Sequence, residues 1–143
     1  MEAEQVSIFV ENRPGRLMAV LEALEKRKIS IKGMSVADAA DVGIVRLIVS
    51  NPAAALEELK SRGFTARIDK VLSTEINDVP GGLLHGVAEP LAQAGVNLHY
   101  FYAYTEQETG KVWAVIKVDD LQKAEKALGR QARSTNIEAR NKQ

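Results

Sequence analysis

The sequence predicts an α+β protein made of two ferredoxin-like βαββαβ units, each an antiparallel sheet with helices on one face. Two observations support this fold class. The hydrophobic pattern runs strand, helix, strand, strand, helix, strand, and then repeats within the 143 residues. A Pro-Gly turn also follows the first strand of each half, with Pro14-Gly15 matched by Pro80-Gly81 at 66 positions further on. We therefore expect two domains, 1–69 and 70–143, that meet directly near Asp69-Lys70.

In the first half, alternating apolar residues predict strands, and apolar residues every three or four positions predict helices. Asn51-Pro52 supplies a helix N-cap followed by a first-turn proline, and Gly63 suits the end of that helix. The expected elements are a strand at 6–10, a helix at 17–27, strands at 29–36 and 44–49, a helix at 52–62 and a strand at 64–68.

The second half repeats this order with one additional residue. Gly95-Val96-Asn97-Leu98 corresponds to Lys28-Ile29-Ser30-Ile31, now at an offset of 67 positions. The extra residue falls near Pro90, where a proline removes a helical hydrogen bond, so we expect a kink or a bulged turn there. The expected elements are a strand at 71–76, a helix at 83–94, strands at 99–105 and 111–118, a helix capped by Asp119 or Asp120, a weak strand at 136–139 and a frayed tail at 140–143.

Strand alternation predicts which side chains face the helices and which face away. Ala114, Ile116 and Val118 are expected to face the helices, together with Tyr100 and Tyr102. The opposite face then collects large apolar groups, which a soluble protein rarely leaves bare. We therefore expect a homodimer that buries residues on this outer face: Phe9, Ile44, Ile48, Phe101 and Trp113.

Composition excludes several classes of function. Nineteen basic and nineteen acidic residues cancel, so no overall charge attracts nucleic acid or a membrane surface. The absence of cysteine rules out disulfides and thiolate chemistry. His85 and His99 are the only histidines and have no nearby pair of acidic residues at a ligand spacing, so no metal site is expected, and no other cofactor is expected either. The acidic start Met1-Glu2-Ala3-Glu4 is unlike a signal peptide, and no apolar run could span a membrane, so a cytoplasmic location is expected.

Each Pro-Gly turn joins a strand to a helix and leaves backbone N–H groups at the helix start. Such groups bind anions, so the carboxylate of a free amino acid could lie near Gly15–Leu17 or Gly81–Leu83. The ammonium group needs an oxygen acceptor, which Asn12 or Asp78 could supply. A purely structural interpretation is that Asn12 and Asp78 cap helices and that Asn97 is a turn residue.

Two stretches, Asn12-Arg13-Pro14-Gly15-Arg16-Leu17 and Asp78-Val79-Pro80-Gly81-Gly82-Leu83, resemble the opening of an ACT domain. Glu11–Gly15 also resembles the serine-sensing ACT domain of phosphoglycerate dehydrogenases, and Ala94–Leu98 resembles the family's helix-to-second-strand corner. The resemblance covers nearly the whole chain and implies a sensor of amino acids that works in side-by-side or stacked pairs. It implies these ligand-binding residues: Asp78, Pro80, Gly81, Gly82, Leu83 and Asn97, with Asn12, Gly15, Arg16 and Leu17 in the first half.

The first half departs from this pattern, since Arg16 stands in place of Gly82 and Ser30 in place of Asn97. The second half is therefore the better candidate for binding. The leading hypothesis is a non-catalytic, amino-acid-binding regulatory protein that acts through ligand-dependent oligomerisation or through a regulated enzyme or regulator. One alternative is a small ferredoxin-like enzyme, although no nucleophile with its base is evident. Another is an RNA-binding module, which the zero net charge disfavours.

Overall fold

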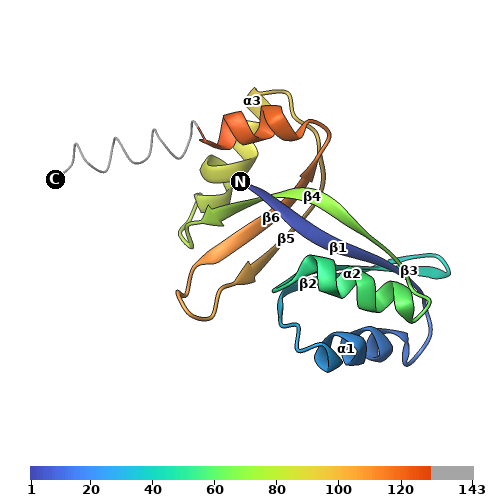
Figure 1. The fold of residues 1–143 in the computed structure, drawn as a ribbon. Coiled ribbons are helices and arrows are strands. Elements are labelled where there is room, and N and C mark those ends of the chain that lie inside the picture. Colours follow the sequence, from blue (N-terminus) through green and yellow to red (C-terminus); the bar gives the residue numbers. More distant parts are fainter. Residues whose placement is uncertain (130–143) are drawn as a thin grey trace. The chain divides into compact units, whose positions relative to one another are not determined.

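The computed structural model describes residues 1–129, and its elements follow the expected order (Figure 1). The chain divides into two compact units. The first unit is Glu4–Lys70, and the second combines Met1–Ala3 with the chain from Val71 onward. The elements are β1 (Glu2–Glu11), α1 (Arg16–Lys26), β2 (Ile31–Ala39), β3 (Val42–Val49), α2 (Pro52–Ser61), β4 (Thr65–Ile76), the π-helix η1 (Leu84–Ala88), α3 (Glu89–Gln93), β5 (Leu98–Thr105), β6 (Val112–Val118) and a helical stretch at 121–129.

In the first unit the strand order is β2-β3-β1-β4, with β1 and β2 both antiparallel to β3. Alternation places Val6 and Ile8 on the face that α1 and α2 cover, opposite Leu47 and Val45 of β3. These side chains are fully buried with residues of both helices, so this face carries the core of the unit. The first unit has the order βαββαβ and the second has βαββα within the described residues, and the predicted fold class is confirmed.

The Asn51-Pro52 pair correctly predicted the start of α2. Asn51 is the N-cap, and its side-chain oxygen accepts a hydrogen bond from the Ala54 N–H at 3.1 Å. Pro52 occupies the first helical turn, where its missing N–H costs no hydrogen bond. By contrast, neither Asn12 nor Asp78 caps the helix that follows it, because the helix starts at α1 and η1 have no side-chain cap.

The two strands expected on either side of Asp69-Lys70 form one continuous twelve-residue strand, β4. No glycine or proline interrupts the sequence there, so the chain stays extended from the first unit into the second. Within the second unit β4 pairs with β6, and β6 pairs with β5, both antiparallel. The Ser73 N–H also donates to the Met1 carbonyl oxygen at 2.7 Å, so the chain start lies beside β4. The strand and the tail expected at 136–143 lie outside the described residues.

The bulge expected in the third helix is present. Residues Leu84–Ala88 form a π-helical segment, and the Glu89 N–H donates to the Leu84 carbonyl, five residues back. Pro90 follows directly, within the first turn of α3. A proline here cannot donate to the preceding turn, and one wide turn absorbs both this defect and the additional residue.

The prediction for the tyrosines of β5 was wrong. A register shift between Leu98 and Tyr100 makes Tyr102 the partner of Val115 and Phe101 the partner of Ile116. Ile116 belongs to the core of the second unit with Ala114 and Val118, as expected, so Phe101 lies on the helix-covered face and Tyr102 on the other. The residue inserted at this shift moves each later side chain of β5 to the opposite face of the sheet, which simple alternation does not anticipate.

Candidate functional site

The turns that follow β1 and β4 have the same backbone. Three hydrogen bonds define each turn, and every bond has its counterpart 66 positions away. In the first turn, Arg13 N–H donates to the Glu11 carbonyl, Arg16 N–H to the Arg13 carbonyl, and Ala19 N–H to the Gly15 carbonyl. In the second turn, Val79 N–H donates to the Asn77 carbonyl, Gly82 N–H to the Val79 carbonyl, and His85 N–H to the Gly81 carbonyl.

Glycine is required at the second position of both Pro-Gly turns, because Gly15 has φ +89° and Gly81 has φ +80°. The second turn is tighter at the next position. A side chain at Gly82 would collide with the carbonyl oxygen of Asn77, whereas the first turn carries Arg16 there. The Gly82 N–H is already used in the turn, which leaves the N–H groups of Gly81 and Leu83 without a hydrogen bond among the described residues.

The polar side chains of the first turn contact other parts of their own unit. The Asn12 amide donates to the Asp38 carboxylate at 3.0 Å, and the Asn12 N–H donates to the Asp41 carbonyl at 3.2 Å. The Arg16 guanidinium lies 4.8 Å from the centre of the Phe64 ring, and its buried Nε has no hydrogen-bond partner within residues 1–129. Leu17 packs against the core. These contacts stabilise the first unit, and the Asn12 side chain is already hydrogen-bonded to Asp38.

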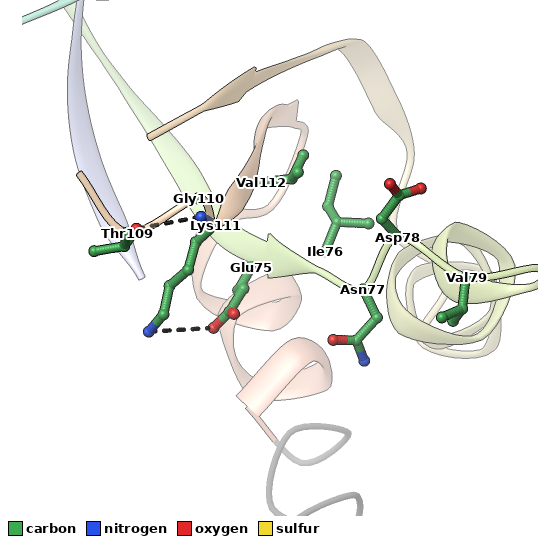
Figure 2. Close-up of a pocket in the computed structure, with 9 residues that line it drawn as sticks. All are labelled: Glu75, Ile76, Asn77, Asp78, Val79, Thr109, Gly110, Lys111 and Val112. Carbon is green, nitrogen blue, oxygen red and sulfur yellow. Dashed lines mark hydrogen bonds and ion pairs between the residues drawn. The ribbon is translucent and has the colours of Figure 1, made fainter. Parts of the chain in front are cut away.

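The second turn presents an acid with no partner. Within residues 1–129 no hydrogen bond or ion pair engages the exposed Asp78 carboxylate. Figure 2 shows it on the side of Ile76 and Val112, at the end of the β4–β6 pair. A pocket of about 390 Å³ lies beside the turn, large enough for a small metabolite. Its lining residues are Glu75, Ile76, Asn77, Asp78, Val79, Thr109, Gly110, Lys111 and Val112.

The β5–β6 hairpin forms the far wall of this pocket and is held together by Glu106. The Glu106 carboxylate accepts hydrogen bonds from the Thr109 hydroxyl at 3.0 Å and from the Trp113 indole at 2.9 Å. The Lys111 N–H donates to the Thr109 hydroxyl, and the Lys111 carbonyl accepts from the Glu106 N–H. These hydrogen bonds define the conformation of the loop. Sequence reasoning missed Glu75, Thr109 and Lys111, although the longer hairpin loop of the second half was a visible signal.

Tyr104 lies next to this hairpin, on the face shared with Trp113. Burial raises the pKa of the Tyr104 phenol, and the nearby Glu106 charge acts in the same direction, while a hydrogen bond with Ser73 lowers it. The phenol consequently remains neutral at physiological pH and adds no charge to this end of the sheet.

Asn97 lies at the opposite end of the same sheet from Asp78. Its backbone is fixed, because its N–H donates to the Asp119 carboxylate at 3.0 Å and its carbonyl accepts from the Asp119 N–H at 3.1 Å. Ile76 pairs with Val112 at one end of β6, and Leu98 pairs with Val118 at the other. The length of β6 is about 20 Å at the usual rise per residue, so the second unit does not bring Asp78 and Asn97 together.

The remaining expected residues of the second turn, Pro80 and Leu83, are exposed. His85 packs its ring beside Gly81, and its Nδ1 lies 2.9 Å from the Glu89 carboxylate. In the part of the chain that the structure describes, no group of three or more His, Cys, Asp or Glu side chains could hold a metal ion. Over the same residues no helix is long and apolar enough to cross a membrane.

Comparison with known proteins identifies the class. The sequence matches the ACT domain pair family over residues 1–139, and the chain belongs to this family. The structure is similar to the crystal structure of protein BT0572 from Bacteroides thetaiotaomicron, with a TM-score of 0.84 and 34% identity over 92% of this chain and 90% of that chain.

The same fold occurs in regulatory subunits of aspartate kinase. The ligand-free subunit from Thermus thermophilus aligns with a TM-score of 0.65 and 19% identity, over 94% of this chain and 96% of that chain. The subunit from Thermus flavus aligns with a TM-score of 0.60 and 16% identity, over 92% and 95%. At these identities the similarity supports the fold alone. Comparison of the sequence with curated proteins finds no match.

Proposed function

We propose that this protein is a non-catalytic, amino-acid-binding regulatory protein, built of two ACT repeats at 1–69 and 70–143. One observation carries the proposal. The two turns have the same pattern of backbone hydrogen bonds. Asn12 of the first turn is hydrogen-bonded within its unit. Asp78 of the second turn has no partner among the described residues and borders a pocket. An exposed, unpaired carboxylate on a glycine-rich turn is suited to the ammonium group of a free amino acid.

The proposed pose follows from the groups that the turn leaves available. The ammonium group of the ligand contacts the Asp78 carboxylate. Its carboxylate lies near the N–H groups of Gly81 and Leu83, since the Gly82 N–H is already hydrogen-bonded to Val79. The absence of a side chain on Gly81 and Gly82 lets a ligand approach the backbone closely.

Asn97 contributes to the same ligand only if it comes from a second copy of the chain. Within one unit it lies about 20 Å from Asp78, along the length of β6, and a free amino acid is far shorter. We therefore propose a homodimer in which the Asp78 turn of one copy faces the Asn97 corner of the other. Such an arrangement is symmetric and makes two equivalent sites.

The surface that suits self-association differs from the one expected from the sequence. Ile48 is buried, Phe9 lies under the Arg67 guanidinium, and Trp113 is hydrogen-bonded to Glu106. Exposed apolar side chains instead recur at matched positions in the two repeats, on the first helix and on the edge strands β2 and β5. The matched pairs are Met18 with Leu84, Ile31 with Leu98, and Met34 with Phe101. Exposed edges and apolar patches of this kind favour pairing with another chain.

The output of such a sensor passes through a change of oligomeric state or through a regulated enzyme or regulator in the cytoplasm. Membership of the ACT domain pair family supports such a role. The proposal includes neither nucleic acid nor a membrane as a partner.

A thermal-shift screen of the twenty L-amino acids tests the proposed function. A compound that binds only the folded protein raises its melting temperature. We expect one amino acid, or a chemically related group, to stabilise the wild type and the Asn12→Ala variant but not Asp78→Ala. No shift with any amino acid at millimolar concentration would contradict the proposal.

A further inference from the structure

Lys111 is the only cationic side chain among the nine residues that line the pocket beside Asp78. We propose that Lys111 binds the α-carboxylate of the amino acid whose ammonium group contacts Asp78. This inference rests on the proposed function, because it assigns a second contact to the same ligand. It also alters the pose, since it moves the carboxylate from the backbone N–H groups of the turn towards the β5–β6 hairpin.

The charges in the pocket lead to this assignment. A free amino acid carries one positive and one negative group, and both need partners when they leave bulk water. The pocket offers two carboxylates, Glu75 and Asp78, and one ammonium, Lys111. None of the three residues Gly81–Leu83 lines it. A ligand carboxylate inside this pocket therefore has Lys111 as its single charged partner.

Lys111 can be released for this role at little cost. Its Nζ lies 3.9 Å from the nearer Glu75 oxygen, and the two side chains are 50% and 47% exposed. Ion pairs this long and this exposed contribute little stability. Figure 2 shows the Lys111 side chain extended towards Glu75 and away from Asp78. Asp78 lies on the side of Ile76 and Val112, whereas Lys111 extends along the side of Glu75. Binding thus requires Lys111 to leave Glu75 and to turn round the end of the β4–β6 pair towards Asp78, and Glu75 competes with the ligand.

The hairpin fixes the base of Lys111 while its side chain stays free to move. Both backbone groups of Lys111 are hydrogen-bonded, the N–H to the Thr109 hydroxyl and the carbonyl to the Glu106 N–H. A lysine side chain is flexible and can rotate towards a ligand from a fixed Cα. In the first unit only Ala40 and Asp41 separate β2 from β3, so its hairpin has no matching lysine.

The test compares each of the twenty L-amino acids with its α-amide, which keeps the ammonium group but lacks the negative charge. Affinities are measured by calorimetry on the wild type, Lys111→Met and the control Lys60→Met, an exposed lysine of α2. Lys111→Met should bind the stabilising amino acid roughly 10- to 100-fold more weakly, the cost of one charged hydrogen bond. It should bind the amide as the wild type does, so that it no longer distinguishes the two compounds. Lys60→Met should behave as the wild type.

Glu75→Gln provides a variant with the opposite expected effect. Removing the competing carboxylate should tighten binding of the amino acid by about two- to fivefold, the range of an exposed ion pair. If Lys111→Met weakens the binding of the amino acid and of the amide equally, or weakens the binding of neither, the inference is wrong. A loss of binding in Asp78→Ala in the same assay would then leave the proposed function standing. If the wild type binds no compound of the panel, the proposed function and this inference both fail.

Discussion

The first and second turns of this protein have the same backbone hydrogen bonds but different side-chain surroundings. In the first turn Asn12 is hydrogen-bonded to Asp38, and Arg16 stacks on Phe64. In the second turn Asp78 has no partner within residues 1–129, and the longer hairpin leaves a pocket of about 390 Å³. A repeated fold element can therefore be structural in one copy and available for binding in the other.

The difference also shows what each turn requires of its residues. Position 16 tolerates a long side chain, whereas the matched position 82 cannot hold even a Cβ atom, because the Asn77 carbonyl oxygen occupies that space. The second turn is thus more constrained in its backbone and less constrained in its polar side chains. That combination is typical of a site that holds a rigid surface ready for a ligand.

The largest expected effect is on ligand affinity in Asp78→Ala. Loss of a charge-assisted hydrogen bond of about 1.5–3 kcal/mol should weaken binding by roughly 10- to 150-fold. The Asp78 side chain makes no helix cap, so the melting temperature without ligand should stay close to that of the wild type. Calorimetry with the amino acid found by the screen measures the loss, and equal affinities would remove Asp78 from the site.

Gly82→Ala should distort the second turn, because the new methyl group meets the Asn77 carbonyl. We expect a stability loss of at least about 2 kcal/mol, together with weaker ligand binding. Gly86→Ala is the matched control, since the added Cβ meets no described atom within 4 Å apart from its chain neighbours and the backbone of its own helix. Urea unfolding followed by Trp113 fluorescence reports on the same unit. Similar stabilities for the two variants would mean that the second turn is less constrained than its geometry indicates.

Asn97→Ala should weaken binding less than Asp78→Ala, because it removes a neutral partner. Its stability should change little, since only the backbone of Asn97 is hydrogen-bonded to Asp119. Calorimetry of the purified variant measures the effect, and an unchanged affinity would leave Asn97 as a turn residue.

Mixing the two variants tests whether Asp78 and Asn97 come from different copies. A mixed dimer of Asp78→Ala and Asn97→Ala has one site with both residues intact and one site with neither. After random exchange about a quarter of all sites should regain the wild-type affinity. Recovery of none would show that the two residues do not share a site across a dimer.

The smallest expected effect concerns acid stability in the first unit. The hydrogen-bonded Arg62 lowers the pKa of the Glu58 carboxyl below its ordinary 4.5, and Arg27 adds to this, although burial acts in the opposite direction. A lowered pKa stabilises the folded state above pH 4.5, and this stabilisation is lost as the pH falls through the folded-state value. Glu58→Gln should therefore melt slightly lower than the wild type at pH 7 and at the same temperature near pH 3. A difference that persists at pH 3 would contradict this cause.

The elements and the two turns could be predicted because their signals are local. Asn51-Pro52 defines a helix start by itself, and Pro14-Gly15 and Pro80-Gly81 mark the repeat at a fixed spacing. The side of β5 that faces the helices could not be predicted, because the bulge between Leu98 and Tyr100 depends on pairing with β6. Lys111 was missed for a similar reason, since it lines the same pocket as Asp78 only because β4 pairs with β6.

The central claim is that only the second turn binds an amino acid, and the number of ligands bound per chain tests it most directly. Calorimetric titration with the amino acid found by the screen should give one site per chain for the wild type and one for Asn12→Ala. It should give a site that is roughly 10- to 150-fold weaker for Asp78→Ala. Two sites per wild-type chain, or loss of the single site in Asn12→Ala with binding retained in Asp78→Ala, would contradict the claim.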